Sequence, residues 1–176
     1  MTRLLQTVIE IERHCADAGW DAPPRLFALV ATADLLARQP DLGLTAPAAE
    51  ERLALLADPG CLTPVEQDEL PPYATLEELL AGIAWPPEVL GAALSVERLM
   101  LPPGVEAAMP QGEQEALRWV AEHPDRQDVR LVVAVLRDGT RQAALRSRSQ
   151  DRAQDVLTGH DLVPALADAL AATLRD

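Results

Sequence analysis

Four arginines in the second half of the chain have a spacing that could bind an anion. Arg137 and Arg141 lie four residues apart, and Arg146 and Arg148 lie two apart. Two side chains separated by two positions on a β-strand point to the same face. A guanidinium can donate paired hydrogen bonds to a carboxylate or a phosphate. Arg137, Arg141, Arg146 and Arg148 are therefore the candidate binding residues, with Arg146 and Arg148 as the clamp.

Two other interpretations of these arginines stay open. Charge on an outer strand keeps the strand soluble and protects its free edge from pairing with another chain. The same side chains could also form ion pairs within the chain, because acidic residues are concentrated upstream. The acidic candidates for such pairs are Glu66, Asp68, Glu69, Glu77 and Glu78.

The charges of the 176-residue chain are segregated. Residues 40–115 contain 14 Asp and Glu against 2 Arg, a balance of −12, whereas residues 116–152 contain 5 acids against 8 Arg, a balance of +3. The net charge of the whole chain is −13. Binding to a phosphate backbone requires a large cationic patch, so we expect no nucleic-acid partner. The segregation favours a surface that attracts charged groups or neutralises itself in the fold.

The sequence contains no motif of a common enzyme class. Its 9 glycines form neither a dinucleotide-binding fingerprint nor a P-loop, and the nucleophile elbow and the paired-cysteine zinc motif are absent. His14, His123 and His160 are far apart in the sequence, so we expect no metal site. Cys15 and Cys61 are expected to be free thiols in a reducing compartment. We therefore expect no cofactor and assign no catalytic residue.

The sequence shows no visible signal for export or membrane insertion. Glu10, Glu12 and Asp17 interrupt the apolar pattern of the first 20 residues, and no run of 18 uncharged apolar residues occurs. We therefore expect a cytoplasmic protein without a membrane partner.

The N-terminal region predicts a helix followed by a buried strand. Apolar residues recur every three or four positions over residues 3–18, which is typical of an amphipathic helix, and Gly19 can take the positive φ of a helix end. Residues 25–32 are apolar on both alternating faces, which favours a buried strand. A helix that runs from residue 25 to Arg38 is the alternative, because alanine and leucine favour helices.

Proline divides the middle of the chain into short elements. Residues 40–110 contain 11 of the 15 prolines, and proline interrupts both helices and central strands. We expect a Pro-rich, acidic, helical insertion over residues 40–93, which would lie over the sheet or form a mobile lid. Its short helices are expected at residues 46–56, 75–83 and 88–93, with Thr75 capping the second of them.

The remaining elements would position the four arginines. Alternating residues over 94–101 predict a half-buried strand, and residues 112–123 predict a helix. A final helix is expected over residues 162–174, with Asp161 as its N-cap.

A hairpin over residues 129–148 is the clearest local signal. Asp138-Gly139 is typical of a two-residue turn between strands 129–137 and 140–148. With Arg137 opposite Thr140, each face of the hairpin is defined. The expected core face contains Val132, Ala134, Leu136, Ala143 and Leu145, and the other face contains Leu131, Val133, Val135, Gln142, Ala144, Arg146 and Arg148.

These elements predict a single α+β domain over residues 1–176. It would contain an antiparallel sheet of about four strands with an N-terminal helix, short acidic middle helices, and a C-terminal helix after the hairpin.

Several segments resemble an actinobacterial family of conserved hypothetical proteins. These segments are Gly19-Trp20-Asp21, Pro24–Val30, Val129–Gly139 and Asp161–Pro164. The resemblance extends over most of the chain outside its Pro-rich middle. The family has no assigned activity, so the resemblance implies no catalytic residue.

The order of the elements is also similar to that of small acidic secretion chaperones. Those proteins combine an N-terminal helix, a twisted antiparallel sheet, an intervening helix, a hairpin and a C-terminal helix. The resemblance implies binding to another protein and a possible homodimer through the intervening helix and the sheet. The insertion over residues 40–93 departs from that pattern.

The leading hypothesis is a non-enzymatic adaptor or chaperone-like domain, whose apolar sheet face or arginine hairpin binds another protein. The alternative is an enzyme or small-molecule binder for an anionic metabolite, with its pocket between the acidic helices and the sheet. In that alternative, Arg146 and Arg148 clamp the anion and Glu97 acts as a base.

Overall fold

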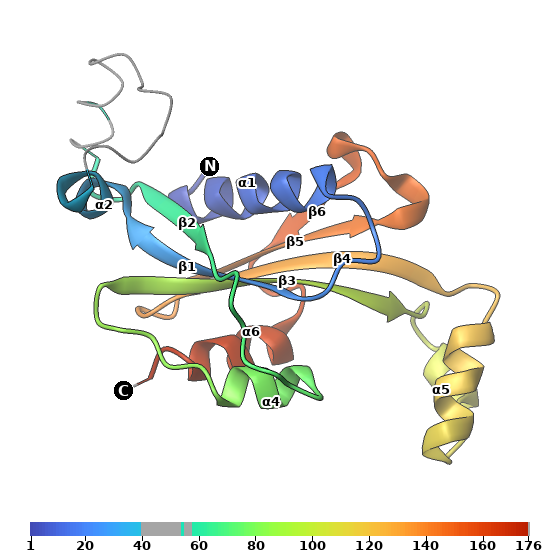
Figure 1. Cartoon of the computed structure of the whole chain (residues 1–176). Helices are drawn as coiled ribbons and strands as arrows, with labels where there is room; N and C mark the ends of the chain where they lie inside the picture. The colour runs from blue at the N-terminus through green and yellow to red at the C-terminus, as the bar shows by residue number, and fades with distance from the viewer. Residues whose placement is uncertain (40–53, 55–57, 176) are drawn as a thin grey trace.

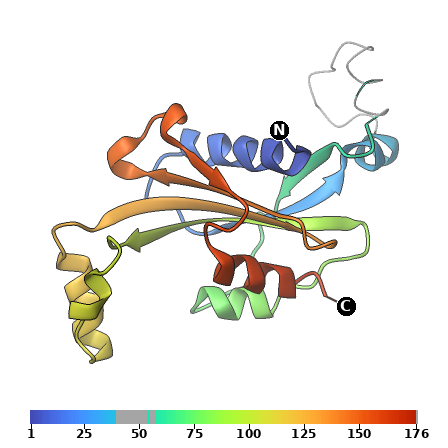
Figure 2. The ribbon, with the colours of Figure 1, turned by 180° about the vertical axis from the view of Figure 1, so that it is seen from behind.

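The chain forms an antiparallel sheet with helices on both faces in a computed structural model, which describes residues 1–39, 54 and 58–175 (Figures 1 and 2). Six strands of the described residues pair in the order β2-β1-β3-β4-β5-β6. These strands are β1 (Arg25–Ala31), β2 (Leu62–Glu66), β3 (Val89–Met100), β4 (Gln127–Leu136), β5 (Arg141–Ser147) and β6 (Leu157–Gly159). The helices are α1 (Arg3–Asp17), α2 (Thr32–Arg38), α4 (Leu76–Ala81), α5 (Glu113–Glu122) and α6 (Pro164–Ala172), with the short 3-10 turns η1 (Val105–Ala108), η2 (Arg148–Gln150) and η3 (Ala153–Asp155).

Helix α1 covers one face of the sheet, as its amphipathic pattern predicted. Thr2 caps the helix, because its hydroxyl accepts a hydrogen bond from the backbone N–H of Leu5 at 3.2 Å. The apolar stripe of α1 packs against the inner residues of four strands. The buried members of this cluster are Leu4, Val8, Ile11, Cys15, Phe27, Leu29, Ala93, Val132, Ala134 and Ala144.

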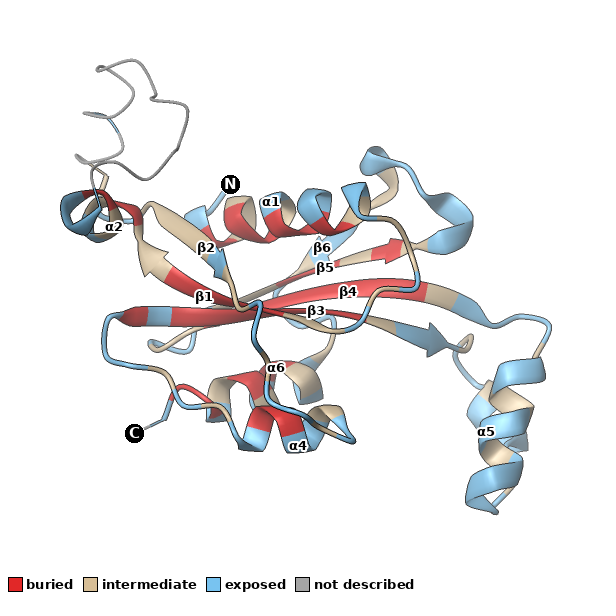
Figure 3. Cartoon of the chain, in the orientation of Figure 1, coloured by how far each residue is buried: buried red, intermediate tan, exposed pale blue. Residues whose placement is uncertain are grey.

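Helices α4 and α6 cover the opposite face. Thr75 caps α4 by accepting from the backbone N–H of Glu78 at 3.1 Å, as expected. The core on this side includes Leu94, Leu131, Val133 and Leu170. Because both faces of the sheet are covered, β4 is buried without interruption from Val129 to Val135 (Figure 3).

The sheet has six strands rather than the expected four, because the sequence analysis did not predict β2 and β6. Strand β2 lies inside the segment that was expected to be helical. Among the described strands it pairs with β1 alone, and an edge strand tolerates Pro64 because one side of its backbone needs no partner. Strand β6 has three residues, too few for a recognisable alternation. The helix expected over residues 46–56 lies outside the described residues, apart from Ala54.

The helix expected at residues 88–93 is wrong, because this segment is the start of β3. It lies between β1 and β4, and burial on both faces outweighs the helix preference of alanine. Gly91 is required there, since a Cβ atom would lie 2.5 Å from the Val135 carbonyl oxygen. The register with β1 shifts at this point, so that Leu29 faces Gly91 and Val30 faces Val89.

The hairpin between β4 and β5 is confirmed, but its predicted register is wrong by one residue. Leu136, rather than Arg137, pairs with Thr140, whose carbonyl accepts from Leu136 N–H at 2.8 Å. The loop therefore has three residues and ends with Gly139 at φ 87°. A shift of one residue moves every side chain of β5 to the other face relative to β4. Arg146 consequently lies opposite Arg130, on the α1 face.

Two further boundaries differ from the expectation. Residues 25–31 form the predicted strand, and a helix begins directly afterwards at Thr32, so each alternative for this segment is realised in part. Helix α6 begins at Pro164 with Val163 rather than Asp161 at its N-cap. In the described part of the chain, no helix is both long enough and apolar enough to cross a bilayer.

Candidate functional site

The four predicted binding arginines do not converge on one site. Arg146 is buried under α1, where its guanidinium donates to both carboxylate oxygens of Glu12 at 2.5 and 2.7 Å. A third bond reaches Asp151 at 3.1 Å. The Glu12 carboxylate, more than the one at Asp151, raises the pKa of Arg146. Arg146 therefore anchors the N-terminal helix to β5.

Arg148 is exposed and binds a different acid. Its two terminal nitrogens donate to the two carboxylate oxygens of Asp21, each at 2.9 Å. These hydrogen bonds lower the pKa of Asp21. Asp21 has a φ of 66°, a left-handed conformation in the loop between α1 and β1. Arg146 and Arg148 thus each hold a carboxylate of the same chain, and their clamping of an external anion stays a prediction.

Arg137 and Arg141 lie at the other end of the hairpin and contact α6 and its surroundings. Arg141 pairs with Asp168 of α6 at 3.0 Å. Arg137 donates to the carbonyls of Val89 and Trp85 at 2.8 and 3.1 Å, and also to that of Leu174. Internal pairing of the arginines is therefore present, but with acids other than those of residues 66–78. Glu66 pairs instead with Arg25 at 2.6 Å.

A buried polar network lies between the α1–β1 loop and the sheet. Arg130, only 1% exposed, stacks on Trp20 at 4.3 Å and donates to Glu97 at 3.3 Å and to the Gly19 carbonyl. Among the described residues, its Nη1 has no hydrogen-bond partner. Glu97, the candidate base, also accepts from the Asp21 N–H at 2.8 Å. The sequence could have indicated this network through Arg130, which is a charged residue within the apolar run of β4.

His14 and Cys15 both lie beside Arg25, whereas His123 lies at the end of α5. His14 lies 3.1 Å from a carboxylate oxygen of Glu66, and His123 stacks edge-on against Trp119. Burial raises the pKa of the Cys15 thiol, against an opposing contribution from Ser95. Within the described residues, no three His, Cys, Asp or Glu side chains form a group that could hold a metal ion.

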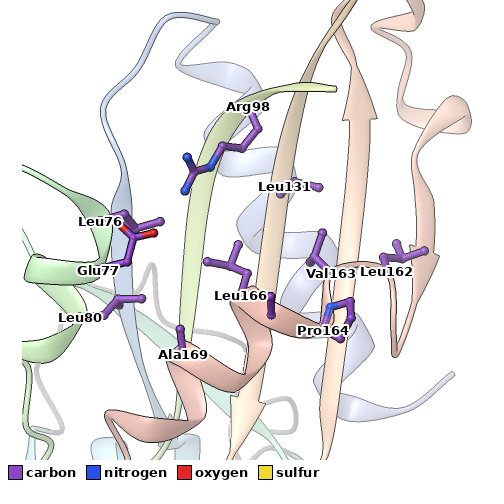
Figure 4. A pocket seen from close by; sticks show the side chains of 11 residues that line it. Leu76, Glu77, Leu80, Arg98, Leu131, Leu162, Val163, Pro164, Leu166 and Ala169 are labelled. Atoms are coloured by element: carbon purple, nitrogen blue, oxygen red, sulfur yellow. The ribbon is translucent and has the colours of Figure 1, made fainter. Parts of the chain in front are cut away.

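An apolar hollow lies on the face of the sheet that carries α4 and α6. Its volume is about 470 Å³. Leu131 of β4 and Arg98 of β3 belong to the sheet wall, and the two helices provide most of the other residues (Figure 4). The remaining lining consists of Leu76, Glu77 and Leu80 of α4, Leu162 and Val163 just before α6, and Pro164, Ala165, Leu166 and Ala169 of α6. The hollow lies between the acidic helix and the sheet, where the sequence placed the pocket of the alternative function.

The ends of β3 and β4, with the segment between them, form an arm that extends beyond the rest of the sheet (Figure 1). The arm comprises residues 97–128 and includes α5. None of its residues is buried (Figure 3). Leu117 on α5 is 67% exposed. Leu99, Met100 and Met109 are also exposed. The arm therefore presents apolar side chains that contribute little to the core.

A depression of about 430 Å³ lies along α5 on this arm. It is lined by Pro110, Gln114, Glu115, Arg118, Trp119 and Glu122. Trp119 is half-buried and Arg118 is exposed, and tryptophan and arginine are among the residue types that dominate binding energy at protein interfaces. The sequence indicated the helix, but only the fold shows that its surface is left open.

Comparison with known proteins identifies a family. A family model described as PPA1309-like protein matches residues 4–175. The chain therefore belongs to this uncharacterised family, which confirms the resemblance expected from its sequence. No curated protein and no solved structure matches the chain.

Proposed function

We propose that this member of the PPA1309-like protein family is a non-enzymatic adaptor or chaperone-like domain that binds another protein through its arm. One observation carries the proposal: an amphipathic helix, α5, buries none of its residues and stands at the end of an extended pair of strands. An amphipathic helix in a folded domain normally buries its apolar face. The half-buried Trp119 in the depression provides the contact that a partner would cover, and Leu117, two positions away on a different side of α5, adds further exposed apolar surface.

The charge of the arm indicates the chemistry of this partner. Residues 97–128 carry 7 acids and 3 Arg, a balance of −4. Glu115 and Glu122 lie beside Trp119 in the depression on α5. An arginine or lysine of the partner can contact both the ring of Trp119 and these carboxylates. We therefore propose a partner with a basic surface.

The experiment is capture of partners by the tagged full chain from its native host, at low and moderate salt, with identification by mass spectrometry. The proposal predicts a stoichiometric partner whose binding weakens as salt rises. Trp119→Ala and Leu117→Glu should each abolish its capture. Leu157→Glu is the matched control, because Leu157 is also exposed, at 61%, but lies on β6. Loss of capture in the control, or retention in both arm variants, contradicts docking through the arm.

A homodimer through α5 is the other outcome of docking on the arm. Two identical arms of charge −4 would repel each other, which favours a different, basic partner. Size-exclusion chromatography with light scattering distinguishes the two. A dimer that Leu117→Glu converts to a monomer would replace the proposed partner with a second copy.

The role is proposed for the cytoplasm, without nucleic-acid or membrane partners. The net charge of −13 supports this proposal, because it opposes binding to phosphate backbones and anionic lipid surfaces. The alternative function, an enzyme or binder of an anionic metabolite, is favoured by the hollow. Arg146 and Arg148 hold acids on the α1 side of the sheet, so an anion in the hollow would meet Arg98.

A further inference from the structure

We infer that the hollow between α4, α6 and the sheet binds a small amphiphile with a single carboxylate, whose apolar chain lies in the hollow and whose carboxylate pairs with Arg98. This site shares no lining residue with the depression on α5 and does not depend on the proposed docking function, although Arg98 lies at the base of the arm. The inference rests on the lining of the hollow, on the state of Arg98, and on the position of Glu77.

The lining of the hollow suits an apolar chain. Leucine, valine, proline and alanine side chains make up nine of its eleven residues. Leu131 is 4% exposed and Leu80 is 5% exposed, so both are fixed by the core. Binding sites for small molecules have volumes of roughly 300–1,000 Å³ and are mainly apolar with few polar groups. The volume of about 470 Å³ lies in this range.

Among the described residues, Arg98 is the cation that lines the hollow, and its guanidinium is free to pair with a ligand. It follows Leu94 and Val96 on the inward-facing side of β3 and is exposed where that strand leaves the core. Its side chain extends into the hollow on the side of α4 (Figure 4). Within the described part of the chain, the guanidinium of Arg98 has neither an ion-pair nor a hydrogen-bond partner. Arg130 and Arg146, by contrast, each hold a carboxylate.

Glu77 restricts the charge of the head group. It also lines the hollow and is exposed, without forming an ion pair with Arg98. A phosphate monoester carries about two negative charges near neutral pH, and Glu77 would repel the second charge that Arg98 cannot neutralise. A carboxylate carries one charge and matches the planar guanidinium with two parallel hydrogen bonds. The hollow therefore favours a carboxylate over a phosphate.

The test is isothermal titration of the full chain with hexanoate, octanoate, decanoate and dodecanoate, with decanol and decyl phosphate as matched probes. Burial of each added methylene should tighten binding by up to about fourfold until the hollow is filled. Decanoate should bind more tightly than both other decyl probes. Absence of binding by all four carboxylates at millimolar concentration overturns the site, and equal binding of decanol overturns the role of the carboxylate.

Four variants locate the ligand. Arg98→Gln should weaken decanoate binding roughly fivefold while leaving decanol unchanged. Glu77→Gln should tighten decanoate binding, because it removes a like charge. Ala169→Phe should abolish binding of both ligands by filling the hollow, and Arg152→Gln is the control, since Arg152 is exposed and outside the hollow.

The variants also separate this site from the docking arm. Circular dichroism must show that Ala169→Phe is folded, and the Arg98 and Glu77 variants provide independent tests because both side chains are exposed. Leu117→Glu should bind decanoate like the unaltered chain. Undiminished binding by Arg98→Gln and Ala169→Phe would place the ligand elsewhere and overturn the inference.

Discussion

The two faces of the sheet differ in where their charged side chains lie, which is buried beneath α1 on one face and exposed at the hollow on the other. On the α1 face, Glu12, Arg130 and Arg146 are at most 4% exposed and are joined to other groups of the chain. On the α4 and α6 face, the core is apolar, and Arg98 and Glu77 lie exposed at the hollow. A buried charge must be paired inside the protein, whereas an exposed one can remain available. The buried charges of the α1 face are therefore already paired within the chain, whereas Arg98 on the other face can pair with a ligand.

The largest expected loss of stability comes from breaking the ion pair between Glu12 and Arg146 under α1. Arg146→Ala should lower the free energy of unfolding by about 3–5 kcal/mol, because it leaves the Glu12 carboxylate buried without its partner. Urea denaturation measures this change. The double variant Glu12→Leu with Arg146→Met removes both charges and should recover most of the loss. A loss below 1 kcal/mol in Arg146→Ala would show that the pair behaves like a surface ion pair.

A smaller loss of stability is expected at low pH, when Glu66 at the edge of the same face becomes protonated. Hydrogen bonds from Arg25, followed by those from His14, lower the pKa of Glu66 below its ordinary value of 4.5. The folded state then binds fewer protons than the unfolded state in this range, so stability falls as the pH decreases. The contribution is complete above pH 4.5 and is lost as the pH falls through the lower folded value.

This pH dependence is measured by thermal unfolding between neutral pH and pH 3, in the unaltered chain and in Glu66→Gln. The stability difference between the two should be largest at neutral pH and should shrink in acid. A difference that stays constant down to pH 3 would assign the role of Glu66 to its shape rather than to its charge.

The smallest expected change in stability comes from substituting Arg98, on the face of the sheet that carries α4 and α6. Arg98→Gln should change the free energy of unfolding by less than about 0.5 kcal/mol, because the exposed guanidinium has no partner within the described residues. Urea denaturation beside Arg146→Gln provides the matched comparison between the two faces. A loss in Arg98→Gln as large as that in Arg146→Gln would remove the distinction between the faces.

The sequence predicted the elements whose formation depends on residues only a few positions apart. The stripe of α1, the Thr75 cap of α4 and the hairpin of β4 and β5 each follow from spacing within a few residues. The segment at residues 88–93 was mistaken for a helix, since its strand conformation depends on partners far away in the sequence. Propensity is a weak guide where burial on both sides decides the structure.

The position of the arginines depended on one residue of register. A two-residue turn at Asp138-Gly139 would place Arg146 on the face opposite Val132, whereas the three-residue loop places both on the α1 face. The sequence therefore identified Arg146 as important without identifying its partner, Glu12, 134 positions away. Arg98 was visible as a charge after Leu94 and Val96 in an alternating strand, but its availability required the fold.

The distance along the chain between Glu12 and Arg146 has a consequence for synthesis on the ribosome. Helix α1 is made before the sheet, and Arg146, the ionic partner of its Glu12, follows 134 residues later. Until then, the apolar stripe of α1 has no completed sheet to cover it. Contacts between distant segments form late, and apolar surface exposed in the meantime favours aggregation. The apolar stripe of α1 is therefore expected to need protection in the nascent chain until β5 has been made.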